Sequence, residues 1–126
     1  MKKTVTILGT KYTILVKVPY TKDPGLANKF GYCSFRGREI VIADLDTIPN
    51  WKNETDDVKS RQYCDTLRHE IIHAYLIESG LWSSSLKFED GWAENEEMVD
   101  WLALQFPKIC KTFTEVGCLG DKWNKS

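Results

Sequence analysis

The chain has 126 residues, of which 42% are hydrophobic and 28% are charged, and its formal net charge at pH 7 is −1. These values are ordinary for one globular domain with an adequate core, so we expect a single domain over residues 1–126. The charge balance disfavours nucleic acid or an anionic membrane as a partner. No apolar run reaches the roughly 20 residues of a transmembrane helix, and the start turns polar too early for a signal peptide. We therefore expect a cytoplasmic protein.

The cysteines lack the Cys-x₂-Cys spacing of a structural zinc site. In a reducing compartment they are expected to be free thiols with a packing role. They are Cys33, Cys64, Cys110 and Cys118. A disulfide between the last two is the alternative.

Residues 1–48 are strand-rich and predict two hairpins, because β-branched and apolar runs alternate with turn residues. The first turn is expected at Gly9-Thr10-Lys11 and the second at Arg36-Gly37. The expected strands are residues 4–8, 12–18, 31–35 and 38–44. A loop is expected between the hairpins and a polar linker after them.

A helix is predicted over residues 55–79, where the apolar pattern takes a helical period. Thr55 or Asp56 can cap its start, and Gly80 is a natural stop. Its expected buried stripe consists of Cys64, Leu67, Ile71, Ala74 and Tyr75.

A second helix is predicted over residues 92–106, after a loop over residues 81–91. Pro107 should interrupt or end it, and residues 108–126 are expected to form a tail with at most a short helix. The expected buried positions are Val99, Leu102, Ala103 and Phe106.

The two histidines of the chain, His69 and His73, stand four residues apart in the first helix. Residues at this spacing lie on one face, so both imidazoles can reach a single ion. With Glu70 they form the His-Glu-x-x-His signature of zinc metallopeptidases. A helix that carries these residues by chance is the alternative.

A catalytic zinc requires three protein ligands and an open position. With no third histidine in the chain, the remaining ligand must be Asp, Glu or Cys. Glu96 lies at the edge of the buried stripe of the second helix and can point inward. Asp100, one turn further, could accept the second N–H of a ligating histidine. Glu94 and Glu97 are more readily explained as a solvated acidic first turn.

The pattern His69-Glu70-x-x-His73 followed by Asn95-Glu96-x-x-x-Asp100 resembles the gluzincin metallopeptidases. The small size is most similar to the minimal ImmA/IrrE-type and phage-encoded enzymes with His-Glu-x-x-His. The resemblance implies an α+β, zincin-like fold, in which an antiparallel N-terminal sheet packs on the zinc helix and a second ligand-bearing helix. It also implies Zn²⁺ held by His69, His73 and Glu96, with Glu70 as the general base.

The chain departs from the ImmA/IrrE type, because Glu96-Glu97-Met98 replaces the common Glu-Ala-Asp. Glu97 is therefore a rival third ligand. Zincins commonly hold extended substrates on an edge strand, and residues 39–43 are either that edge or an ordinary interior strand. Tyr63, Arg68 and Tyr75 are near the motif, but the role of oxyanion stabiliser is left unassigned.

The function expected from this resemblance is a zinc metallopeptidase that hydrolyses a peptide bond in an intracellular protein partner, such as a repressor or a phage protein. The alternative is a catalytically inactive metal-binding or interaction protein of a phage or mobile element. Neither a membrane nor nucleic acid is expected as a partner.

Overall fold

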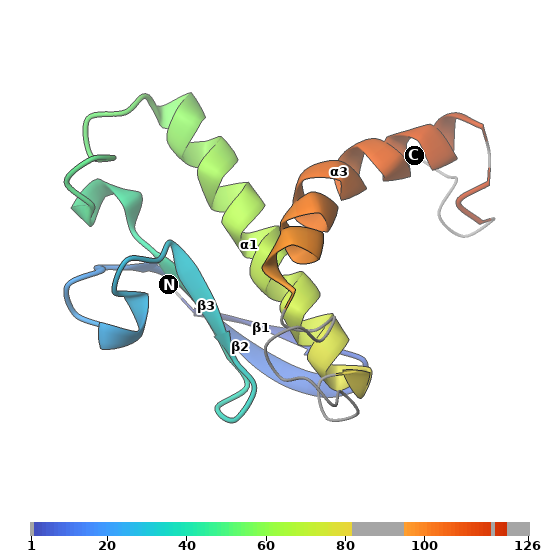
Figure 1. Cartoon of the computed structure of the whole chain (residues 1–126), viewed down its shortest axis with the longest axis horizontal. Coiled ribbons are helices and arrows are strands. Elements are labelled where there is room, and N and C mark those ends of the chain that lie inside the picture. The colour runs from blue at the N-terminus through green and yellow to red at the C-terminus, as the bar shows by residue number, and fades with distance from the viewer. Residues whose placement is uncertain (1, 82–94, 117, 121–126) are drawn as a thin grey trace.

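The computed structural model describes residues 2–81, 95–116 and 118–120 (Figure 1). A four-stranded sheet and two helices make up most of this part. The elements are β1 (Lys2–Ile7), β2 (Thr10–Val18), β3 (Gly31–Ser34), β4 (Glu39–Ala43), α1 (Asp56–Glu78) and α3 (Glu96–Glu115). None of the helices in the described ranges has both the length and the hydropathy needed to span a bilayer.

The strand order of the sheet is β1-β2-β4-β3. The two predicted hairpins are present, since β1 pairs with β2 and β3 with β4 in antiparallel fashion. The two central strands, β2 and β4, are parallel, so the expectation of a wholly antiparallel sheet is wrong. The chain between them is long enough to return β4 alongside β2 in the same direction. As a result β4, over residues 39–43, is an interior strand, and β3 lies at the edge.

The turn between β1 and β2 consists of Leu8 and Gly9, earlier than the predicted Gly9-Thr10-Lys11. Both residues have positive φ, 48° and 87°, as a two-residue type I′ turn requires. Thr10 and Lys11 already pair with β1. The glycine suits this turn because it adopts positive φ without steric cost.

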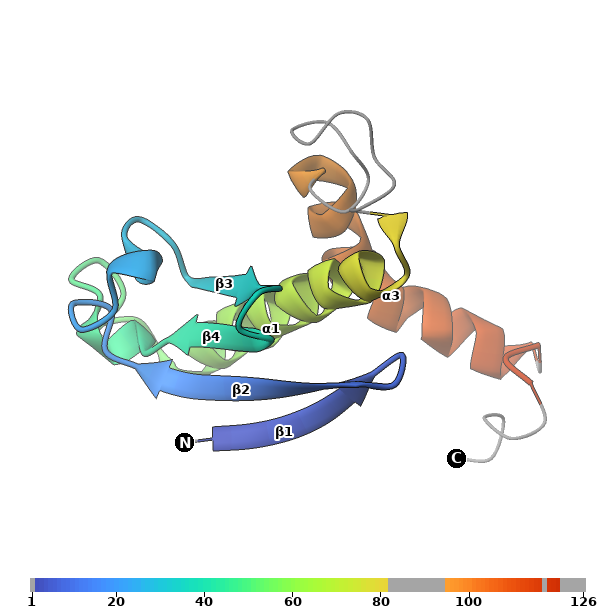
Figure 2. The same ribbon diagram turned by 90° about the horizontal axis from the view of Figure 1, so that it is seen from below.

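Helix α1 lies across one face of the sheet (Figure 2). As predicted, Thr55 caps its start, with its Oγ1 accepting a hydrogen bond from the Val58 amide at 3.3 Å. At the other end the buried Tyr12 of β2 donates its hydroxyl to Glu78 at 2.8 Å. Side chains of the sheet and of α1 form the main core between them, namely Ile7, Tyr12, Ile14, Val16, Ile40, Ile42 and Ala74.

The buried surface of α1 is wider than the predicted stripe and includes polar residues. Cys64 and Tyr75 are exposed, contrary to expectation, whereas Leu67 and Ile71 are half-buried and Ala74 is buried. Thr66, Glu70 and His73 are the buried polar side chains. The helix therefore presents one side to the sheet and an adjoining polar side to the functional site described below.

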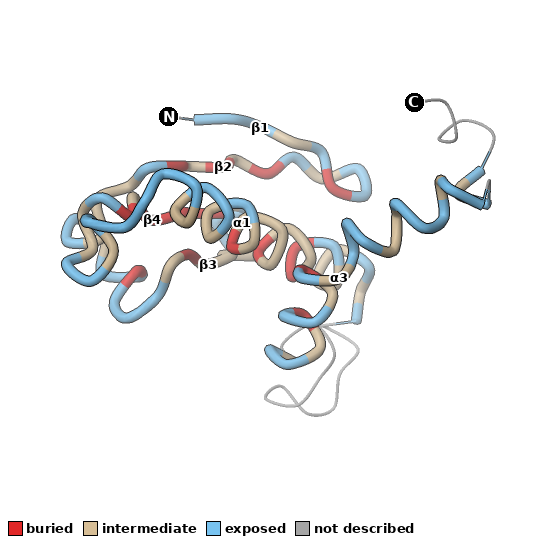
Figure 3. Tube along the Cα trace, turned by 90° about the horizontal axis from the view of Figure 1, so that it is seen from above, coloured by how far each residue is buried: buried red, intermediate tan, exposed pale blue. Residues whose placement is uncertain are grey.

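Helix α3 packs on α1 and extends away from the sheet, and its far half is mostly exposed (Figure 3). The Asn95 side chain caps its start by accepting from the Met98 amide at 2.7 Å. The helix continues through Pro107 to Glu115, so the predicted end at residue 106 and tail from residue 108 are wrong. The predicted start at residue 92 and nearly all of the predicted loop lie outside the described residues.

Side-chain burial on α3 follows the prediction only in part. Val99 and Ala103 are buried and Leu102 is half-buried, but Phe106 is exposed because this end of α3 has left the body of the protein. The four cysteines are free thiols, as expected. Two of them, Cys64 and Cys118, are exposed and have no packing role.

Candidate metal centre

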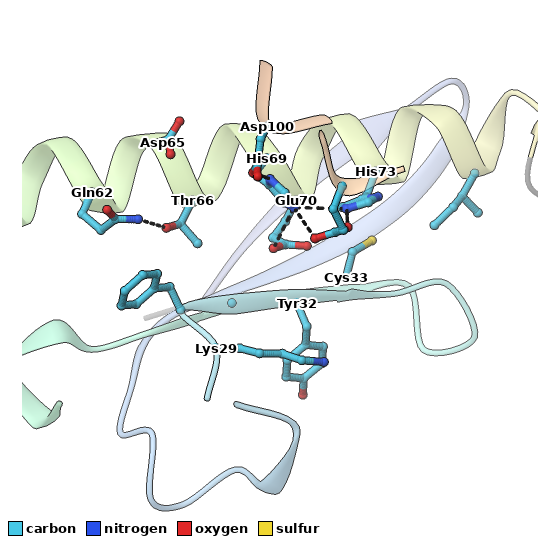
Figure 4. A pocket seen from close by; sticks show the side chains of 14 residues that line it. Lys29, Tyr32, Cys33, Gln62, Asp65, Thr66, His69, Glu70, His73 and Asp100 are labelled. Carbon is cyan, nitrogen blue, oxygen red and sulfur yellow. Dashed lines mark hydrogen bonds and ion pairs between the residues drawn. The ribbon is translucent and has the colours of Figure 1, made fainter. Parts of the chain in front are cut away.

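One turn of α1 brings three potential metal ligands together (Figure 4). The Nε2 atoms of His69 and His73 are 3.1 Å apart. With Glu70 they form a group whose ligand atoms all lie within 4.8 Å of one another and could hold a metal ion. The predicted consequence of the i, i+4 spacing, two imidazoles converging on one point, is confirmed.

Glu96 is the first residue of α3, and its side chain contacts both histidines of α1. Its Oε1 lies 2.7 Å from His73 Nε2, and its Oε2 lies 3.4 Å from His69 Nε2. Ligands bound to one tetrahedral zinc at about 2.0–2.1 Å stand about 3.3 Å from each other. The two imidazoles and the Glu96 carboxylate are therefore close enough to share one ion, although each imidazole contacts a different oxygen of the carboxylate. Glu70 is farther away, with its Oε2 4.0 Å from His69 Nε2.

Asp100 contacts the other nitrogen of His69. Its Oδ1 is 2.7 Å from His69 Nδ1, within hydrogen-bond distance. A neutral imidazole that donates Nδ1–H to this carboxylate keeps Nε2 unprotonated and directed toward Glu96 and His73. The structure thus places Asp100 where the sequence predicted it.

Glu97 is exposed and takes no part in the ion pairs that join α3 to the histidines. Successive helical residues are about 100° apart, so the two adjacent glutamates cannot face the same point. The geometry favours Glu96 over Glu97 as the third ligand.

We expect Glu96→Gln to weaken zinc binding strongly and Glu97→Gln to leave it within about twofold, because only the first carboxylate contacts the imidazoles. Asp100→Asn should cost about 10-fold, as the loss of a partner of a ligating histidine typically does. Competition with a chromophoric chelator ranks the three variants, and Glu97→Gln is the matched control. A larger loss at position 97 than at 96 would contradict this assignment.

Burial dominates the electrostatics of Glu70, whose residue is only 7% exposed. Desolvation raises the pKa of its carboxyl above the ordinary value, the two imidazoles lower it, and the Glu96 carboxylate raises it again. A carboxylate with a raised pKa is better suited to accept a proton near neutral pH than an exposed one. The environment therefore agrees with the role of general base.

A cavity of about 510 Å³ opens beside these residues, between α1, the start of α3 and the edge strand β3 (Figure 4). Gly31 lets β3 approach α1 at this cavity. A Cβ there would lie 2.8 Å from the Val41 carbonyl oxygen and 3.0 Å from Thr66 Cγ2. The cavity is lined by Lys29, Phe30, Gly31, Tyr32, Cys33, Gln62, Asp65, Thr66, His69, Glu70, His73, Ile77, Glu96 and Asp100.

Several of these lining residues were missed by sequence reasoning. Gln62 and Thr66 precede Glu70 by two turns and one turn on the same face of α1, so helical periodicity could have identified them. The contribution of β3 depends on its position in the sheet, for which the sequence carries no local signal. Tyr63, Arg68 and Tyr75, which were considered for oxyanion stabilisation, do not line the cavity.

No protein-family model matches the chain, and no curated protein or solved structure matches it either. The similarity to gluzincins is therefore limited to the sequence motif, and the interpretation of the site depends on its own geometry.

Proposed function

We propose that the chain is a zinc-dependent peptide hydrolase in which His69, His73 and Glu96 hold the ion and Glu70 is the general base. The observation that carries this proposal is the convergence of two imidazole nitrogens and one carboxylate from different helices. A second, buried carboxylate stands beside them at the wall of an open cavity. This combination is typical of hydrolytic zinc sites with three protein ligands.

Bound zinc supplies a Lewis acid and a water of lowered pKa. The chain supplies the proton transfers. Glu70 takes a proton from the attacking water and delivers it to the nitrogen of the leaving amine. Asp100 holds the Nδ1–H of His69 and so keeps that ring in the tautomer and orientation in which Nε2 faces the site.

The position of β3 at the edge of the sheet supports an extended peptide as the substrate. The Ala43 amide donates to the Phe30 carbonyl at 2.8 Å. This bond and the register show which residues of β3 direct their backbone groups toward β4 and which direct them away. In this register the backbone groups of Gly31 and Cys33 are directed away from β4. Both residues line the cavity, so a peptide added to this edge passes along the candidate centre.

The proposal is tested by incubating the purified protein with a library of unstructured peptides and identifying fragments by mass spectrometry. Zinc-loaded protein should cleave a subset of the library. Protein stripped by a chelator should not, and restoring zinc should return the same fragments. Sequences common to the cleaved peptides would define the substrate.

Two negative results have different meanings. Protein that binds about one zinc per chain but yields no fragments would favour the alternative of an inactive metal-binding protein. Protein that binds no zinc would remove the ligand assignment itself.

A further inference from the structure

The side chain of Arg68 joins the two helices that carry the candidate ligands. Its Nε donates to the backbone carbonyl of Ala103 in α3 at 2.7 Å. Ala103 is only 1% exposed, so this carbonyl is largely shielded from water. In a regular helix the amide four residues later would bond it, but that residue is Pro107, which has no N–H. Arg68 thus provides the donor that the proline removes.

This hydrogen bond lies close to the candidate centre on both helices. Arg68 immediately precedes His69 in α1. Ala103 follows Asp100 by one turn and Glu96 by two turns of α3. The guanidinium also lies 3.8 Å from Asp65 Oδ1 on its own helix, and that buried oxygen has no hydrogen-bond partner among the described residues.

The carboxylates of Glu96 and Asp100 depend on the placement of α3 as a whole. Their side chains are 67% and 63% exposed, so packing does little to hold them individually. The buried residues of α3 are Val99 and Ala103, whose apolar side chains make no directional bond to α1. A hydrogen bond between the helices is directional and sets their relative position.

We propose that Arg68 is a positioning residue that acts together with Pro107. Its bond to the freed carbonyl of Ala103 sets α3 so that Glu96 and Asp100 meet the two imidazoles. This inference rests on the metal site of the proposed function and adds to it a residue that contacts neither metal nor substrate.

The test uses four substitutions in the full chain. They are Arg68→Ala, Pro107→Ala, both together, and Arg61→Ala as a matched control. Arg61 is on the same helix and pairs with Asp57 at 3.1 Å on the surface. Zinc affinity is measured by chelator competition, and the melting temperature of each metal-free protein is measured separately.

Arg68→Ala should weaken zinc binding about 10-fold, as the loss of groups that orient ligands does. It should also lower the metal-free melting temperature, because the buried Ala103 carbonyl loses its donor. In the double variant the amide restored at position 107 can donate to this carbonyl. The melting temperature should then recover toward that of Pro107→Ala, while zinc affinity stays low. Arg61→Ala should bind zinc within about twofold of wild type.

The proposal is overturned if Arg68→Ala binds zinc within twofold of wild type. It is also overturned if the double variant regains affinity together with stability, since Arg68 would then serve only to satisfy a carbonyl.

A metal-free measurement keeps this inference separate from the proposed function. The chain has only two histidines, so the ¹⁵N resonances of both rings can be resolved. His69 should carry its proton on Nδ1, next to Asp100, in the wild type and in Arg61→Ala. Arg68→Ala should lose this preference. If wild type binds no zinc, the proposed site fails while this readout still decides the role of Arg68, and an unchanged tautomer would refute that role.

Discussion

Replacing His73 by Ala should lower zinc affinity by at least about 100-fold. Zinc sites in small domains contribute on the order of 10 kcal/mol, so each of three protein ligands accounts for roughly 3 kcal/mol. The His73 imidazole is buried and its Nε2 contacts both His69 and Glu96, so its removal takes away one of the three proposed ligands. Metal content after dialysis and competition with a chelator measure the loss.

His69→Ala should have at least as large an effect, because it removes a ligand and also the partner of Asp100. Bound metal stabilises the native state, so zinc should raise the melting temperature of wild type but not of either variant. Melting in excess chelator is the control, since all three proteins are then compared without metal. Retention of one zinc per chain in either histidine variant would contradict the ligand assignment.

Glu70→Gln should abolish hydrolysis while zinc remains bound. The amide keeps the size of the side chain but cannot accept a proton, and a positioned general base contributes about 10²–10⁴-fold to a rate. Glu70 is not one of the three proposed ligands, so its replacement should leave His69, His73 and Glu96 in place. The measurements are zinc stoichiometry and kcat/KM on a peptide identified from the library.

The stability of the metal-free protein provides an independent check on Glu70. Burial raises the pKa of its carboxyl in the folded state above the unfolded value. The burial of Glu70 therefore costs no stability at low pH, where the carboxyl is protonated in both states. The folded state loses stability as the pH rises from the ordinary carboxyl range through the raised pKa of the folded state. Metal-free Glu70→Gln should melt above metal-free wild type at pH 7, and the difference should shrink toward pH 4. Zinc binding by the same variant is the second check. If Glu70→Gln loses zinc as readily as the two histidine variants, Glu70 is a ligand.

The parts of the structure that were predictable from sequence are those governed by local geometry. The convergence of His69 and His73 follows from the period of a helix, and the cap at Thr55 follows from hydrogen bonding within one turn. The contact of the exposed Glu96 with the histidines follows from the same period, because Glu96 lies next to the buried Val99 on the side of α3 that meets α1.

The wrong predictions concern features that depend on contacts between segments far apart in the sequence. The pattern of β2 and β4 is compatible with parallel or antiparallel pairing, and only the path of the intervening chain selects one. A proline usually ends a helix, but α3 continues through Pro107, and Arg68 from another helix donates to the Ala103 carbonyl that the proline cannot bond. The exposure of Tyr75 likewise depends on which elements cover α1.

Because its ligands lie on two helices, the proposed ion would connect α1 to α3 in the way that a covalent cross-link does. His73 and Glu96 are 23 positions apart in the sequence and enclose 22 residues. A disulfide closing a loop of that length would restrict the unfolded chain by about 3 kcal/mol. Loss of the ion would remove this cross-link but leave the packing of α3 on α1 and the Arg68 bond in place, so the protease resistance of α3 should decrease as the free zinc concentration falls.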